Sequence, residues 1–257
     1  RQVSVTLLDV EDVTLRFGGI VALDGLSFSI DESHICGLIG PNGAGKTTMF
    51  NVVSRIYQPT LGSVRFRGEE LLTVPAHAIA RLGIARTFQN LALFPTMTLL
   101  ENVMVGAHSQ GRVGFGKAIS RISAAGDNRR TRDDAGDLLH ELGLGHLAFV
   151  PAAGLPFGTL KRLEIARALA ARPSFLLLDE PAAGLPHGEV DELGHTISTI
   201  RDQFNLTVLL VEHHMSMVMS ISDRVVVMEF GRKIAEGTPS EVQNNEKVIE
   251  AYLGTTA

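Results

Sequence analysis

Residues 40–48 combine the residue types that bind phosphate groups. The segment consists of Gly40, Pro41, Asn42, Gly43, Ala44, Gly45, Lys46, Thr47 and Thr48, and it fits the P-loop pattern G-x-x-x-x-G-K-[ST]. Three glycines allow backbone conformations that are closed to other residues, so successive N–H groups can point inward at an anion. Lys46 can reach the β- and γ-phosphates of a nucleotide, and the Thr47 hydroxyl can hold Mg²⁺. All nine residues are therefore predicted to bind the phosphates of a nucleotide.

Two carboxylates directly follow an apolar run at residues 175–178. A buried parallel strand would place Asp179 and Glu180 at its carboxyl end, where open α/β sheets bind ligands. Asp179 is expected to support Mg²⁺ from behind its direct ligands, and Glu180 to act as the general base that activates water. The alternative is an ordinary solvated strand end, which the accompanying phosphate loop disfavours.

Gln89 and His213 are further candidates because each stands near the end of an expected strand. Gln89 could contact Mg²⁺ or the attacking water, and His213 could donate a hydrogen bond to the γ-phosphate. A single histidine is more often a core or surface residue, but the buried strand before His213 favours the functional interpretation. His214 is the weaker candidate, since adjacent side chains point apart.

The elements that must position these residues alternate between apolar strands and helices. The expected strands are 34–39, 175–178 and 206–211, and the expected helices are 47–55, 160–171 and 189–205. Such alternation predicts an α/β fold with a mostly parallel sheet and helices on both faces.

Two other regions differ from this alternating core. Residues 3–30 alternate apolar and polar positions around a turn at Gly18-Gly19, which predicts antiparallel strands with one buried face. From 92 to 155 strand-like runs are absent, and helices are expected at 98–105, opened by a Thr98–Glu101 capping box, and at 133–142. The basic residues of 106–132 could contact lipid headgroups or a partner, although a solvated helical face is the favoured interpretation.

Composition is that of an ordinary globular protein. The 257 residues are 45% hydrophobic and 20% charged, and the net charge of −5 argues against nucleic-acid binding. The single cysteine, Cys36, excludes an internal disulfide and a cysteine-based zinc cluster. With no long apolar run and no evident signal peptide, the chain is expected to be soluble and intracellular.

The order and spacing of these motifs resemble those of ATP-binding cassette (ABC) transporter ATPases over essentially the whole chain. Residues 155–169, which begin Leu-Pro-Phe-Gly-Thr, occupy the place of the signature sequence of that family. The resemblance implies a P-loop NTPase (RecA-like) core with an antiparallel β subdomain, formed by 1–91 and 156–257. It further implies an inserted α-helical subdomain, 92–155, that leads into the signature.

The resemblance also implies a composite ATP site shared by two subunits. Gly158, near the start of a helix, would face the γ-phosphate held by the other subunit. Phe17 matches the aromatic residue that stacks on adenine, although it also fits the strand alternation as a core residue. Two departures weaken the match, since Pro156 replaces a serine of the signature and Pro186 replaces a more usual aspartate.

Several segments resemble the ATPases of branched-chain amino acid importers, among them 180–185 and 234–242. The expected function is hydrolysis of ATP, with Mg²⁺ as cofactor, that energises the import of branched-chain or related amino acids through a separate membrane permease. The expected partners are a second ATP-binding subunit and that permease, which would hold the chain at the cytoplasmic face of the inner (plasma) membrane. The alternatives are another cargo, such as urea or lipopolysaccharide, a non-transport ATPase of the same family, or a non-catalytic nucleotide switch.

Overall fold

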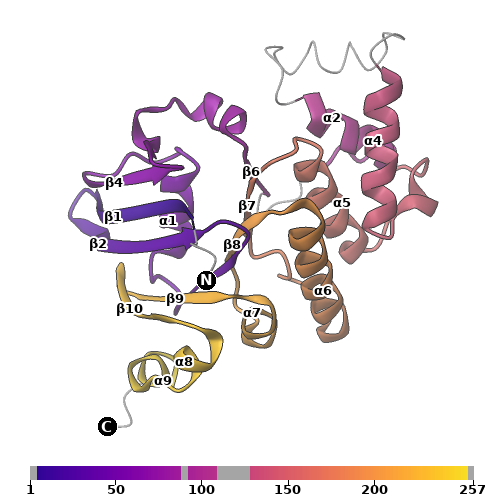
Figure 1. The fold of residues 1–257 in the computed structure, drawn as a ribbon. Coiled ribbons are helices and arrows are strands. Elements are labelled where there is room, and N and C mark those ends of the chain that lie inside the picture. The colour runs from indigo at the N-terminus through magenta and orange to yellow at the C-terminus, as the bar shows by residue number, and fades with distance from the viewer. Residues whose placement is uncertain (1–4, 88–91, 109–127, 254–257) are drawn as a thin grey trace.

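A computed structural model describes residues 5–87, 92–108 and 128–253. Its strands form two sheets, with helices covering the larger one, which confirms the predicted α/β fold. Figure 1 shows the sheet of β1, β2 and β4 at one end of the molecule and the helices α2 and α4 at the other, with β7 and β8 between them.

The central sheet is mostly parallel and fully buried at its middle. Within the described ranges it has six strands in the order β10-β9-β3-β8-β7-β6, and only β10 runs antiparallel to its neighbour. The strands are β3 (Ile35–Ile39), β6 (Ile84–Arg86), β7 (Phe175–Asp179), β8 (Thr207–Val211), β9 (Arg224–Glu229) and β10 (Arg232–Gly237). Every residue of β3, β7 and β8 is buried, as expected for parallel strands covered on both faces. Their carboxyl ends therefore meet at one edge of the sheet.

The second sheet is antiparallel and carries the alternating pattern seen in the sequence. Its order, within the described residues, is β2-β1-β4-β5, with β1 (Thr6–Phe17), β2 (Ile20–Asp31), β4 (Leu61–Phe66) and β5 (Glu69–Glu70). The predicted turn at Gly18-Gly19 joins β1 to β2. Apolar residues of this sheet, such as Val10 and Phe66, pack in one cluster with Phe50 of α1 (Lys46–Val53) and Phe175 of β7. This cluster fixes the antiparallel sheet beside the helix that follows the phosphate loop.

Helices form the layer on the other side of the central sheet. They are α2 (Leu99–His108), α4 (Asn128–Glu141), α5 (Phe157–Leu169), α6 (His187–Phe204) and α7 (Met215–Ile221), followed by α8 (Pro239–Gln243) and α9 (Glu246–Leu253). A second apolar cluster joins Val103 of α2 and Leu139 of α4 to Leu176 and Leu210 of the sheet. Among the described residues, no helix has the length and apolar character needed to cross a membrane.

Three helix starts differ from the sequence-based prediction by two residues or more, and one of them is α6, which begins at His187 rather than Glu189. α4 begins at Asn128 rather than Asp133, because residues 128–132 include no apolar residue that would mark a helix in the sequence. α5 begins at Phe157 rather than Leu160, directly after Pro156, whose φ of −55° and ψ of 147° end the preceding loop. The predicted capping box of α2 is confirmed, since Glu101 N–H donates to Thr98 Oγ1 over 3.2 Å and Thr98 N–H donates to Glu101 Oε2 over 2.8 Å.

Close contact between α2 and α5 depends on Gly106. A Cβ at this position would overlap the carbonyl oxygen of Arg167, whereas a Cβ at Gly136 of α4 would enter open space. We expect Gly106→Ala to lower the free energy of unfolding by about 1–3 kcal/mol, because α2 must move outward. Gly136→Ala should raise it by up to about 1 kcal/mol, because alanine favours the helix. Urea unfolding of both variants checks this, and equal effects at the two positions would contradict it.

Candidate functional site

The loop between β3 and α1 turns sharply at its glycines. Gly40 and Gly45 have φ values of +152° and +97°, which favour glycine. A Cβ at Gly40 would overlap the carbonyl oxygen of Met228, and one at Gly45 would lie 2.6 Å from that of Ala22. Glycine is thus required here both for backbone conformation and for space. The loop ends at the N-terminus of α1, whose first N–H groups and dipole favour an anion.

Lys46 places its ammonium group at this loop. Its Nζ donates to the carbonyl oxygen of Gly40 over 2.7 Å and to that of Pro41 over 3.0 Å. Burial lowers the pKa of Lys46, and the nearby negative charge of Glu180 opposes that shift. The loop therefore combines N–H donors with a fixed positive charge that faces a carboxylate.

A hollow of about 290 Å³ gathers residues that are far apart in the sequence. It is lined by Ile20, Val21 and Ala22 of β2, by Asn42, Gly43, Ala44, Gly45, Lys46, Thr47 and Thr48, and by Glu180 and His213. The parallel order of β3, β8 and β7 explains this, because loops at the carboxyl ends of neighbouring strands open on the same side.

Glu180 and His213 are in direct contact at the edge of this hollow. His213 Nε2 lies 2.6 Å from Glu180 Oε1, so the two side chains share a hydrogen bond. Glu180 has a left-handed φ of +48°, and its N–H donates to the carbonyl oxygen of Val211 over 2.8 Å. His214 points elsewhere, with Nδ1 3.0 Å from Glu212 Oε2. The two adjacent histidines thus contact different carboxylates, in agreement with the expectation that they point apart.

Asp179 is held by an arginine that the sequence analysis did not single out. Asp179 Oδ2 accepts from Arg86 Nη2 over 3.1 Å, and the side chain of Asp179 is only 1% exposed. Arg86 Nη1 also donates to Asn51 Oδ1 and Ser54 Oγ over 2.7 and 2.9 Å, which ties α1 to β7. Burial raises the pKa of Asp179, and the Arg86 charge opposes the rise. Arg86 could have been found as the last residue of a strand next to β7 in a parallel sheet.

The second oxygen of Asp179 suits a divalent cation. Oδ1 is buried and has no hydrogen-bond partner within the part of the chain that the structure describes. The described residues contain no cluster of three or more metal-ligating side chains. Mg²⁺ is typically bound through one or two carboxylates together with substrate phosphates and water, so a carboxylate oxygen with no partner among the described residues is compatible with this ion.

The start of α5 lies apart from this hollow within one chain. Gly158 lines a separate cavity of about 320 Å³ together with Glu189 of α6. A Cβ at Gly158 would overlap Oε2 of Glu189, which is the end of an exposed, flexible side chain that can move aside. The predicted role of Gly158 toward a nucleotide in another subunit remains a prediction.

Phe17 is not among the residues that line the hollow, and the same holds for Gly40, Pro41, Asp179 and Gly158. Phe17 is the last residue of β1 and is 45% exposed, so the alternative of a strand core residue is wrong. Its ring packs edge-on against Tyr57 at a centroid distance of 5.1 Å. Gln89 lies outside the described residues, so its predicted roles stay predictions.

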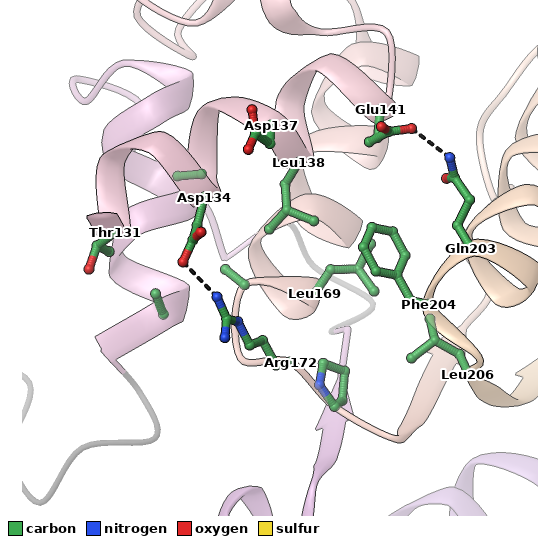
Figure 2. A pocket seen from close by; sticks show the side chains of 14 residues that line it. Thr131, Asp134, Asp137, Leu138, Glu141, Leu169, Arg172, Gln203, Phe204 and Leu206 are labelled. Atoms are coloured by element: carbon green, nitrogen blue, oxygen red, sulfur yellow. Dashed lines mark hydrogen bonds and ion pairs between the residues drawn. The ribbon is translucent and has the colours of Figure 1, made fainter. Parts of the chain in front are cut away.

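A larger cavity of about 820 Å³ lies between α4, α5 and α6 and contains none of the predicted site residues. Figure 2 shows its two polar contacts, Asp134 with Arg172 and Glu141 with Gln203, around the apolar side chains of Leu138, Leu169 and Phe204. None of the residues that line it belongs to the phosphate loop, and neither Glu180 nor His213 is among them.

Comparison with known proteins agrees with this geometry. A family model described as ABC transporter matches residues 23–183, and one described as Branched-chain amino acid ATP-binding cassette transporter matches residues 232–257. The chain is 45% identical over 249 residues to the high-affinity branched-chain amino acid transport ATP-binding protein BraF of Pseudomonas aeruginosa, covering 96% of this chain and 98% of that protein. It is 42% identical over 252 residues to LivG of Escherichia coli K12, a protein of the same description, covering 98% and 99%.

Solved structures confirm the predicted P-loop NTPase fold. The crystal structure of the ADP conformation of MJ1267, an ATP-binding cassette of an ABC transporter, matches with a TM-score of 0.86 and 30% identity, covering 97% of this chain and 99% of that one. The phosphate loop, the paired Glu180 and His213 and these likenesses all agree: the chain belongs to the ABC transporter family, in the group of the branched-chain amino acid transport ATP-binding proteins.

Proposed function

We propose that this chain hydrolyses ATP to energise the import of branched-chain amino acids through a separate membrane permease. The observation that carries the proposal is the Glu180–His213 pair, which faces the phosphate loop across one hollow. The names of BraF and LivG supply the cargo class.

ATP binding would use groups that already face the hollow. The phosphates would accept hydrogen bonds from N–H groups of the loop and of the start of α1, and Lys46 Nζ would exchange its two carbonyl contacts for phosphate oxygens. Phe17, exposed at the end of β1, would stack on the adenine.

Hydrolysis needs a base, a donor to the γ-phosphate and charge neutralisation. The Glu180 carboxylate would take a proton from the attacking water, and His213, released from Glu180, would donate to the γ-phosphate. Thr47, Gln89 and Asp179 are the residues that would hold Mg²⁺, which supplies neutralisation of phosphate charge when bound. Gln89 would also orient the water.

The assembly is proposed to contain two ATP-binding subunits and a permease. Gly158 and the N-terminus of α5 would approach the γ-phosphate held by the other subunit, and Pro156 would contribute no hydroxyl there. Docking of a permease helix between the core and residues 92–155 would hold the chain at the cytoplasmic face of the inner (plasma) membrane.

The base assignment is tested by Glu180→Gln. An amide cannot accept the proton of the attacking water, so hydrolysis should fall by about 10²–10⁴-fold. ATP affinity should be retained, because the phosphate loop is unchanged. Phosphate release and binding of a fluorescent ATP analogue give the two values, with the exposed Glu69→Gln as the matched control. Hydrolysis at the parental rate in Glu180→Gln would show that another group is the base.

The magnesium assignment is tested by Asp179→Asn. We expect the Mg²⁺ concentration that half-saturates hydrolysis to rise by about 10- to 100-fold, since a charged group that supports the ion is lost. A Mg²⁺ titration of hydrolysis measures this, and Asp191→Asn, on the exposed surface of α6, is the control. An unchanged Mg²⁺ requirement in Asp179→Asn would contradict the assignment.

The cargo is tested with the purified transporter complex in lipid vesicles. Leucine, isoleucine or valine, presented with the matching solute-binding protein, should stimulate ATP hydrolysis, because binding energy of the cargo promotes closure of the ATPase pair. Stimulation by urea or another solute, with no response to branched-chain amino acids, would identify a different cargo.

A further inference from the structure

A buried carboxylate, Glu212, joins the loop after β7 to the loop after β8. It directly follows Val211, the last residue of β8, and its side chain is 1% exposed. Glu212 Oε1 accepts from the Ala182 N–H over 2.7 Å. Glu212 Oε2 accepts from the N–H groups of His213 and His214 over 2.8 and 3.1 Å and lies 3.0 Å from His214 Nδ1.

Backbone groups supply most of the partners of this charge. No ion pair between Glu212 and a lysine or arginine occurs among the described residues, and its ring partner is His214. A buried carboxylate is costly unless its oxygens are hydrogen-bonded, and charge-assisted bonds to N–H groups are short and strong. Glu212 therefore fixes the backbone at Ala182, His213 and His214 together, and moving any of them leaves part of a buried charge unsatisfied.

The residues held in this way flank the two proposed catalytic side chains. Ala182 is two positions after Glu180, whose left-handed φ of +48° is unfavourable for a residue with a side chain. The Val211 carbonyl holds the Glu180 N–H on one side, and the Glu212 carboxylate holds the loop on the other. His213 is fixed through its own N–H. One carboxylate thus sets the backbone from which Glu180 and His213 reach each other.

We propose that Glu212 is a positioning residue for ATP hydrolysis. By accepting hydrogen bonds from the backbone of both loops, it keeps the side chains of Glu180 and His213 in contact. The proposal rests on the proposed function, since it assumes that Glu180 is the base. Glu212 does not line the hollow, and its described hydrogen bonds include none to the phosphate loop. Replacing it should therefore lower the rate of hydrolysis and leave the affinity for ATP unchanged.

Glu212→Gln is the sharpest variant because it keeps the shape of the side chain. Its amide has one acceptor oxygen in place of two. The NH₂ group must therefore face either the N–H of Ala182 or the N–H groups of His213 and His214. We expect kcat to fall about 10- to 100-fold, in line with the cost of a displaced catalytic group. KM and the binding of a fluorescent ATP analogue should stay within about twofold. Hydrogen exchange of a peptide covering 180–186 should accelerate, while exchange in 207–211 stays slow.

Three matched variants separate the possible causes. His214→Ala keeps the three backbone bonds and should retain the parental rate, and the exposed Glu246→Gln is the control for charge. Glu212→Asp shortens the side chain but keeps the charge, so its kcat should lie between that of the parent and that of Glu212→Gln.

If Glu180→Gln is inactive while Glu212→Gln has parental kcat, the positioning role is wrong and the base assignment stands. If Glu180→Gln itself hydrolyses ATP at the parental rate, the base assignment on which the positioning role rests is wrong, although the chain is still an ATPase. A loss of ATP binding or faster exchange in 207–211 in both Glu212 variants would show a general structural role instead.

Discussion

Parallel pairing of β3, β8 and β7 is the constraint on which the site depends. The three strands are buried on every residue, and their pairing in register leaves Ile39, Asp179 and Val211 at one edge of the sheet. The loops that follow these three residues must therefore all begin at this edge of the sheet. The phosphate loop, Glu180 and His213 are therefore neighbours because of hydrogen bonding between strands whose own side chains are entirely apolar or buried.

Three carboxylates at this edge are stabilised in three different ways. Asp179 is balanced by the Arg86 guanidinium, Glu180 contacts the His213 ring, and Glu212 is surrounded by backbone N–H groups and the ring of His214. The first arrangement leaves one oxygen without a hydrogen-bond partner among the described residues, whereas in the third both oxygens accept hydrogen bonds. The environments differ although the residues are chemically similar, and the difference fits the three roles proposed for them: cation binding for Asp179, a base for Glu180 and a structural anchor for Glu212.

The sequence was most informative where one signal was continuous along the chain. The phosphate loop occupies nine consecutive residues, and β7 and β8 are uninterrupted apolar runs, so the α/β fold and the place of Glu180 and His213 could be predicted. Arg86 was missed because its strand, Ile84–Arg86, is too short to show periodicity. The start of α4 was missed because residues 128–132 include no apolar residue. The three N–H bonds of Glu212 depend on the turns after two strands, which side-chain patterns do not encode.

The two carbonyl contacts of Lys46 have a consequence for the thermodynamics of association. Because its ammonium group already bridges Gly40 and Pro41, the loop is a closed hydrogen-bonded ring before any phosphate arrives. An incoming triphosphate exchanges partners within an ordered ring and does not have to order the chain. The conformational entropy of this segment is thus lost when the protein folds. The entropic cost of binding then comes mainly from the lost translational, rotational and internal freedom of the nucleotide.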